Sequence, residues 1–328
     1  MTSETKVDRD GKQTKVMKYN ERDELIESTF TNKKGSIKTK YAYDVEGNKT
    51  VAKNGKIEER YKYNKRGQLE SVKSNKGTKT YTYDKNGHVR RIKQNDGLVD
   101  KMTYNDFGMM TSLNNQNLES AYKYDANNNR IQTKTVDIAK YNDAKSKEEM
   151  AGQFDVVAQR IALMDESFNC NVALNGSIDY SGVGYVQVPR GDASNLDYGT
   201  ETIDYLSDGD VSVAKVLHED SSIAKNDKVY TYGADVIKAN NEYYLTKING
   251  TISKITNNKG QVKKSLEYSD YGQELSGYSG GKAYNGEMVD ATGLQYLRAR
   301  YLDMNMGMFI QKDTYLGEQD DILSQNQS

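Results

Sequence analysis

The chain has 328 residues, with 46 basic and 47 acidic side chains, and 35% of its residues are hydrophobic when its 26 tyrosines are counted. This balance lacks the basic footprint of nucleic-acid-binding proteins, and no run of about 18 apolar residues is available to span a membrane. One cysteine and two histidines exclude an internal disulfide and, without carboxylate help, a usual zinc site, so we expect no metal and no cofactor. A polar stretch follows Met1, and the sequence therefore shows no signal peptide.

Tyrosine followed by aspartate or asparagine recurs along the first 130 residues. These tyrosines are 24, 20, 20, 21 and 20 residues apart, which is too regular for chance and indicates a structural repeat. The six positions are Tyr19, Tyr43, Tyr63, Tyr83, Tyr104 and Tyr124.

Each repeat unit has the same internal order. An alternating run such as Tyr61-Lys62-Tyr63 predicts a strand with both tyrosines on one face. A turn signal such as Asp44 to Gly47 follows, in which the short polar side chain caps the turn and glycine takes a positive φ. Asp23 and Asn128 stand at the glycine position in the first and sixth units, and both residue types tolerate that conformation. A second strand and a further turn signal, such as Asn54-Gly55, complete a unit of two antiparallel strands.

The middle of the chain departs from this pattern. The repeat stops after Gln132, and residues from about Asn142 to Ser167 are predicted to form a helix. We interpret residues 138–199 as an insertion that acts as a packing element, and the β pattern resumes from Thr200. The predicted helix rests on apolar residues at steps of three and four, namely Met150, Phe154, Val157, Ile161 and Met164.

The C-terminal part carries the most specific motif. It comprises Tyr284 to Glu287, then Asp290 to Asp303, then Gly307 to Asp313. This order resembles the signature of the Rhs-repeat-associated core, and the tyrosine repeats resemble the YD repeats of the same Rhs/YD family. That family includes bacterial polymorphic toxins, the C components of ABC toxin complexes, and teneurins.

The resemblance implies a mainly β fold, in which an antiparallel YD-repeat ribbon spirals into part of a hollow shell, with a small α-containing insertion. It divides the chain into the ribbon at 1–137, the insertion at 138–199, further strands at 200–280, and the core at 281–328, ending before a toxin. The chain is then expected to be a C-terminal shell fragment of a longer protein that is secreted or held at the cell surface.

The function implied by the resemblance is encapsulation of a C-terminal toxin domain, with the core as the end-plug. Expected partners are that toxin domain, upstream shell repeats, and a delivery or immunity protein, but no nucleic acid. One alternative is a carbohydrate-binding or adhesion module of the teneurin type, in which exposed tyrosines stack on sugars. Another alternative is an aspartyl autoprotease, active in the intact parent and not in this fragment.

The resemblance also suggests catalytic residues for self-cleavage. Asp313 matches the first aspartate of the family motif, with Thr314 in place of its proline, while Asp303 and Arg300 are the nearest polar groups. Two carboxylates divide acid and base roles when their environments separate their pKa values. The structural alternative is that Asp303 and Asp313 form turns or ion pairs. Met304 also replaces a family proline, which weakens the catalytic hypothesis.

The remaining candidate residues favour no chemistry. His88 follows a turn and is predicted to be exposed, and His218 lacks a second histidine at metal-binding spacing. Cys170 has no histidine nearby in the sequence and is interpreted as a structural residue.

Overall fold

The computed structural model describes residues 2–8, 11–150, 200–207, 213–218, 228–277 and 281–313. These residues fall into two compact units. Unit 1 comprises the first 100 residues together with the chain from Met308 onward, and unit 2 comprises Lys101–Gly307. Each unit combines strands of the repeats with a part of the C-terminal segment.

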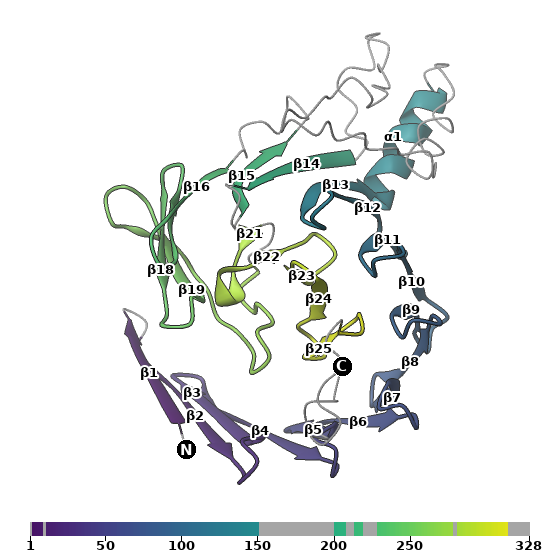
Figure 1. Cartoon of the computed structure of the whole chain (residues 1–328). Helices are drawn as coiled ribbons and strands as arrows, with labels where there is room; N and C mark the ends of the chain where they lie inside the picture. Colours follow the sequence, from purple (N-terminus) through teal and green to yellow (C-terminus); the bar gives the residue numbers. More distant parts are fainter. Residues whose placement is uncertain are drawn as a thin grey trace. The chain divides into compact units, whose positions relative to one another are not determined.

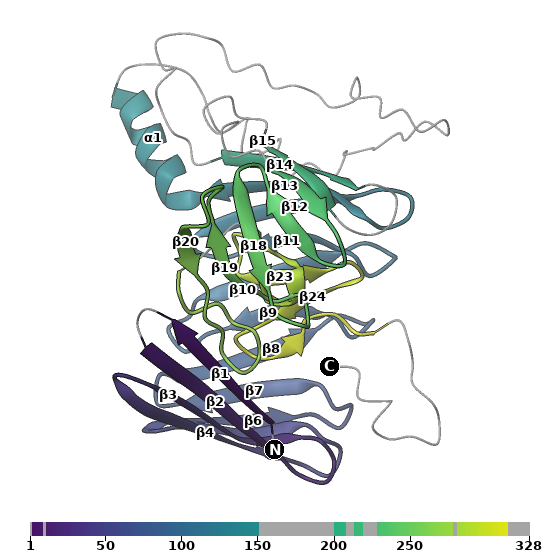
Figure 2. The same ribbon diagram turned by 90° about the vertical axis from the view of Figure 1, so that its left-hand side faces the viewer.

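Unit 1 is built on an antiparallel meander in which each strand pairs with the next one along the chain (Figure 1). Figure 2 shows the first four of these strands as neighbours at the N-terminal end. The strands are β1 (Thr2–Asp8), β2 (Gly11–Tyr19), β3 (Leu25–Asn32), β4 (Gly35–Tyr43), β5 (Lys49–Asn54), β6 (Ile57–Tyr63), β7 (Leu69–Ser74), β8 (Gly77–Tyr83) and β9 (Val89–Lys93).

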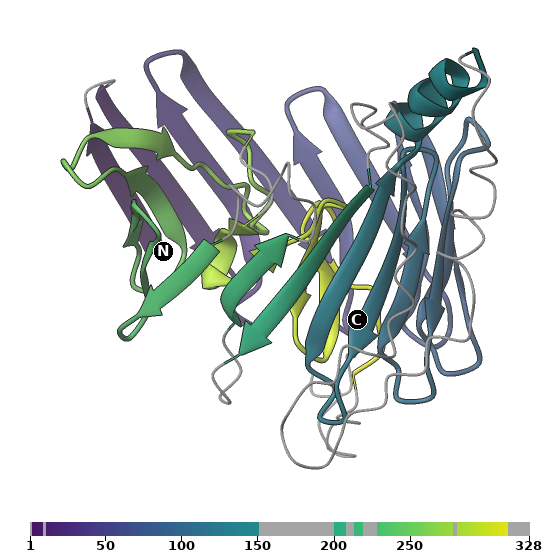
Figure 3. The same cartoon turned by 90° about the horizontal axis from the view of Figure 1, so that it is seen from above.

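Unit 2 continues in the same way from β10 to β20, again by antiparallel pairing of successive strands. A helix, α1 (Ile138–Met150), follows β13 directly, and Figure 3 shows it continuing from the end of that strand. The strands are β10 (Val99–Tyr104), β11 (Met110–Asn114), β12 (Leu118–Tyr124), β13 (Arg130–Asp137), β14 (Thr200–Ser207), β15 (Val213–His218), β16 (Lys228–Tyr232), β17 (Val236–Ala239), β18 (Glu242–Thr246), β19 (Ile252–Thr256) and β20 (Val262–Ser265).

Residues 281–313, here called the core segment, form short elements instead of long hairpins. Four strands in unit 2 pair in sequence order and antiparallel, and a short strand in unit 1 follows them. The elements are β21 (Gly281–Lys282), the 3₁₀ turn η3 (Tyr284–Gly286), β22 (Met288–Val289), β23 (Leu294–Leu297), β24 (Arg300–Asp303) and β25 (Met308–Phe309).

The strands bury one face, as their alternating sequences predict. In β7, Leu69 and Val72 are buried while Glu70 and Lys73 are exposed. The buried face of unit 2 includes one hydrophobic cluster to which the core segment contributes Met288. The other members of this cluster are Tyr205, Tyr230, Val236, Ala239, Tyr244, Ile252, Ile255 and Leu266.

The repeat turns have the predicted geometry. In the second tyrosine repeat, the amide of Gly47 donates to the Asp44 carbonyl at 3.2 Å, and the Asp44 amide donates to the Asn48 carbonyl at 2.9 Å. Asp23 and Asn128 take the glycine position with φ values of 59° and 63°. The sequence therefore identified these turns correctly, including the two without glycine.

The described part of the chain confirms a mainly antiparallel β fold with one short α-helix. The predicted helix start at Asn142 was wrong, because the helix begins at Ile138. The Asp137 side chain accepts hydrogen bonds from the amides of Ala139 and Lys140 at 3.0 and 3.1 Å, which caps the helix immediately after β13. The predicted continuation to Ser167 lies outside the described residues.

Candidate functional site

The repeat tyrosines join successive hairpins through their hydroxyl groups. Five tyrosines each donate a hydrogen bond to the backbone carbonyl of the residue that lies six positions after the preceding repeat tyrosine, or after the residue in its place. Phenylalanine would fill the same space without this bond, so the hydroxyl explains why the repeat uses tyrosine. The pairs are Tyr43 to Leu25 at 2.9 Å, Tyr63 to Lys49 at 2.9 Å, Tyr83 to Leu69 at 2.8 Å, Tyr124 to Met110 at 2.7 Å and Tyr268 to Ile252 at 2.8 Å.

The environment keeps these hydroxyls protonated. Burial raises the pKa of the Tyr83 phenol above its ordinary value of 10.0, and burial together with the nearby Asp44 carboxylate does the same for Tyr63. A protonated phenol can donate to a carbonyl, whereas a phenolate cannot. The tyrosine contacts are therefore stable at neutral pH.

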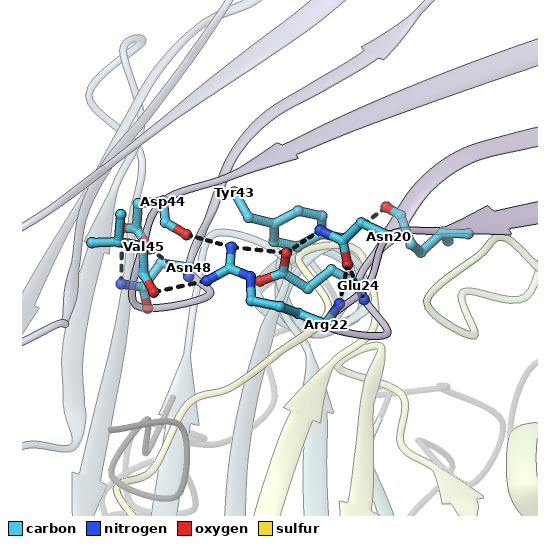
Figure 4. A network of polar contacts seen from close by, with 8 residues as sticks. Asn20, Arg22, Glu24, Tyr43, Asp44, Val45 and Asn48 are labelled. Carbon is cyan, nitrogen blue, oxygen red and sulfur yellow. Dashed lines mark hydrogen bonds and ion pairs between the residues drawn. The ribbon is translucent and has the colours of Figure 1, made fainter. Parts of the chain in front are cut away.

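A second contact joins the first two turns (Figure 4). The Arg22 guanidinium donates to the carbonyl oxygens of Val45 at 2.8 Å and Asp44 at 3.0 Å. Glu24 holds the guanidinium from the other side at 3.0 Å. The Asp44 carboxylate is itself occupied by the Asn48 amide at 2.8 Å. Arg22 thus fixes the distance between neighbouring turns, in addition to the tyrosine bond.

The most unusual site is an arginine enclosed between β13 and the core segment in unit 2. Arg130 Nη1 lies 2.6 Å from Asp290 Oδ2, and the two side chains are 0% and 4% exposed. Nη1 also donates to the Tyr301 hydroxyl at 3.1 Å. The guanidinium carbon lies 4.2 Å from the centre of the Tyr296 ring and 4.5 Å from that of Tyr205. We call these five residues the arginine cage.

The Asp290 carboxylate stabilises the buried positive charge of Arg130 in the cage. Burial alone would lower the pKa of Arg130, but the adjacent Asp290 carboxylate together with the Tyr205 and Tyr301 phenols outweighs it, and the pKa of the guanidinium lies above its ordinary value. Burial raises the pKa of the Tyr301 phenol well above 10.0. Two stacked tyrosine rings add a cation–π attraction that is stronger away from water. The cage is a neutral, desolvated cluster that ties the core segment to the ribbon.

A buried lysine lies in the same segment. Lys282 Nζ donates to the Gly286 carbonyl at 3.1 Å and lies 5.3 Å from the centre of the Tyr232 ring. The whole residue is 3% exposed. Burial lowers its pKa to about 8, although the nearby Glu287 carboxylate opposes this change.

In unit 1 the core segment contacts the repeats at His88. The histidine is 8% exposed, so the prediction of an exposed side chain was wrong. Its Nδ1 accepts a hydrogen bond from the Lys312 amide at 3.2 Å, and the neighbouring Val89 amide donates to the Ile310 carbonyl at 2.8 Å. The core segment covers the imidazole, and the local sequence around His88 carries no sign of a contact 224 residues away.

The structure describes all three residues that were suggested for self-cleavage, namely Asp303, Arg300 and Asp313. Asp303, at the end of β24, caps a turn, because its Oδ1 accepts hydrogen bonds from the amides of Asn305 at 2.9 Å and Met306 at 3.3 Å. This geometry agrees with the structural alternative for Asp303. Arg300 opens β24 opposite Leu297. Asp313 belongs to unit 1 and the other two residues to unit 2, so their catalytic cooperation stays a prediction.

Sequence reasoning missed Arg130 and Lys282, the two buried cations where the core segment meets the ribbon. Arg130 follows a repeat turn and resembles any polar strand residue, and its partner Asp290 lies 160 residues away. The sequence did contain one indication of this site: the turn-forming Asp290 is followed closely by Tyr296 and Tyr301. His218 lies in β15, its side chain is not described, and Cys170 lies outside the described residues.

Within the residues that the structure describes, no group of three or more histidine, cysteine, aspartate or glutamate side chains is arranged to hold a metal ion. The described helices also include none that is long and apolar enough to cross a membrane.

Comparison with solved structures gives distant matches. The crystal structures of TcdB2-TccC3-Cdc42 and of TcdB2-TccC3 are both 17% identical to this chain and cover 98% of it, with TM-scores of 0.33. A structure of the Photorhabdus luminescens Tc holotoxin pore is 16% identical over 98% of this chain, also with a TM-score of 0.33. This chain covers 20%, 21% and 20% of those chains, about a fifth of their length. No curated protein sequence matches it.

The family comparison is more specific. Residues 1–146 match the family described as Teneurin YD-shell. This range covers the six tyrosine repeats and reaches into α1. The match confirms the Rhs/YD-repeat resemblance that the spacing and turns of the tyrosine repeats predicted. Residues 1–146 are therefore similar to a YD-shell of the teneurin and Rhs type.

Proposed function

We propose that this chain is a wall segment of a secreted bacterial container that encloses a C-terminal toxin domain, and that the core segment closes the wall from inside. The observation that supports this function is the arginine cage. It buries an ion pair between a ribbon strand and the core segment, with the side chains of Arg130 and Asp290 0% and 4% exposed. A segment held in this way sits on the buried side of the ribbon as a fixed part of the fold.

The construction of the ribbon is consistent with a wall. Tyrosine hydroxyls join hairpin to hairpin at a constant repeat position, so further repeats can be added without new contacts. Five tyrosine hydroxyls donate hydrogen bonds to backbone carbonyls, so we assign those tyrosines a structural role. The adhesion alternative would therefore need other residues than these.

The test uses the natural reading frame that surrounds this chain, expressed as one polypeptide with the segment that follows Ser328. Limited proteolysis is followed by mass spectrometry of the cargo peptides. A container predicts that the cargo survives protease concentrations that digest the same cargo expressed alone. Digestion of the cargo at the rate of the free polypeptide, while residues 1–313 stay intact, would refute the proposal.

Arg130→Ala in the same polypeptide tests the proposed closing role of the core segment, with Arg66→Ala as the matched control on an exposed repeat turn. We expect the first variant to expose the cargo and the second to leave it protected. Equal protection in both variants would show that the cage is not needed for closure.

A further inference from the structure

The end of the core segment is held by one repeat turn in unit 1. The Lys312 amide donates to His88 Nδ1 at 3.2 Å, and the Val89 amide donates to the Ile310 carbonyl at 2.8 Å. The Lys312 side chain also lies against Gly87, where an added Cβ would come within 3.2 Å of Lys312 Cδ. Three consecutive residues of the repeat therefore contact the stretch from Ile310 to Lys312.

The residue that follows the turn glycine, or the asparagine in its place, closes its own turn in other repeats. Asn48 Nδ2 donates to Asp44 Oδ2 at 3.0 Å, and Asn129 Nδ2 donates to Asp125 Oδ2 at 3.1 Å. His88 occupies this position in the fourth repeat, and it is the one imidazole at this position among the six tyrosine repeats. Its side chain binds a segment that lies 224 residues away in the sequence. The imidazole thus distinguishes this turn from its relatives.

The contact requires a neutral imidazole. Nδ1 can accept the Lys312 amide only when it carries no proton, so the proton of neutral His88 is on Nε2. Protonation would place the Nδ1–H donor against the N–H donor of Lys312 and break the bond. Burial lowers the pKa of His88, the Lys312 charge adds to this effect, and the Asp84 carboxylate of its own turn opposes it. The bond is therefore intact at neutral pH and is lost in acid.

The attachment of the core segment in unit 2 differs in chemistry. The arginine cage contains no histidine, and histidine is the side chain whose charge ordinarily changes between pH 5 and 8. We propose that His88 is an acid-sensitive latch, which selects the Asp84 turn as the docking site of residues 308–313 and releases them when its imidazole is protonated. The cage keeps its hold on the core segment under the same conditions.

The latch goes beyond the container function, because it needs only residues 1–328 and no cargo. In a container it would make the C-terminal end of the core segment the part that mild acid loosens, with the wall and the cage left intact. Failure of the latch would leave the container function standing, and loss of the container function would leave the latch standing.

The experiment measures hydrogen exchange of the Lys312 amide by NMR in the full chain at pH 7.5 and 5.5, corrected for the intrinsic pH dependence of exchange. We expect exchange to rise roughly two- to tenfold at pH 5.5, as loss of one hydrogen bond allows. His88→Met removes the acceptor and should give the faster exchange at both pH values. The turn tolerates methionine at this position, since Met109 occupies it in the fifth repeat and is 5% exposed.

His218→Met is the matched control, because His218 is the other histidine of the chain, and it should keep the pH dependence of the unsubstituted protein. Exchange of residues 294–303, in β23 and β24, should be the same at both pH values. A measurement without substitution follows the ¹⁵N shifts of the imidazole, and the titration of His88 should coincide with the change at Lys312.

Three results would overturn the latch. The first is a Lys312 amide as protected in His88→Met at pH 7.5 as in the unsubstituted chain. The second is a rise in exchange at pH 5.5 that is equal for residues 294–303 and Lys312, because acid would then loosen the whole core segment. The third is a His88 that titrates with no change at Lys312.

Discussion

Arg130 and Asp290 form an ion pair with a distance of 2.6 Å between Nη1 and Oδ2, and both side chains are almost fully enclosed. Such a pair contributes little compared with an apolar replacement, yet breaking it leaves an uncompensated buried charge. The pair therefore fixes where the core segment lies on β13 more than it adds to stability.

The first prediction follows from that asymmetry. Asp290→Ala should lower the free energy of unfolding of unit 2 by about 3–5 kcal/mol, because it leaves the Arg130 charge buried without its partner. Combining it with Arg130→Met should restore part of the loss. Urea denaturation measures both effects. The pair of Arg298 and Glu287, whose side chains are 46% and 22% exposed, is the control, and Arg298→Ala should cost about 0–1 kcal/mol.

The tyrosine hydroxyls allow a second prediction. Tyr83→Phe removes the donor to the Leu69 carbonyl, and Leu69 is only 1% exposed, so the carbonyl loses its partner away from water. We expect a loss of about 1–2 kcal/mol in the free energy of unfolding. Tyr19 is the matched control, because it is 37% exposed and its hydroxyl contacts only the Met17 sulfur at 3.5 Å. A loss in Tyr19→Phe as large as in Tyr83→Phe would contradict the proposed role of the hydroxyl.

Particular residues show how far the sequence predicts this structure. The Asp44 turn and its relatives could be predicted because every partner lies within four residues, as with the Asn48 amide on Asp44 Oδ1 at 2.8 Å. The arginine cage could not, because Arg130 and Asp290 are 160 residues apart and neither belongs to a local motif for ion pairing. His88 was misjudged for the same reason, since the segment that covers it comes from the far end of the chain.

Lys282 should make stability depend on alkaline pH. Burial lowers its pKa from 10.5 to about 8, so between these values the unfolded chain binds a proton that the folded chain does not. Stability contributed by this group therefore rises with pH from about 8 toward 10, by roughly 1–2 kcal/mol over the first pH unit or so. Burial also raises the pKa of several tyrosines, which lowers stability above pH 10, so the measurement should stop near pH 9.5. Lys282→Met should remove the rise, and an equal slope in that variant would contradict the assignment.

His88 should make stability depend on acidic pH. Burial lowers its pKa below 6.5, against the opposing effect of Asp84, and its Nδ1 must be unprotonated to accept the Lys312 amide. As pH falls below about 6.5 the unfolded chain gains a proton that the folded contact resists, so stability is lost. Hydrogen exchange of residues 308–313 should therefore increase at pH 5.5 relative to pH 7.5. His88→Phe should make the exchange of this segment, corrected for its intrinsic pH dependence, equal at both values.

Self-cleavage can be separated from turn formation by two matched substitutions in the chain extended through its natural reading frame. Asp303→Asn keeps the side-chain oxygen that caps the turn at Asn305 and Met306, so a purely structural Asp303 predicts unchanged fold and unchanged cleavage. Asp313→Asn removes the carboxylate that the family motif assigns to the reaction, and we expect it to stop cleavage. Gel electrophoresis with mass spectrometry of the fragments is the measurement. Full-length product from the unsubstituted chain, or the same fragments from Asp313→Asn, would exclude a catalytic role for Asp313. Loss of cleavage in Asp303→Asn with its thermal stability retained would instead restore Asp303 as the second carboxylate, because only the charge has then changed.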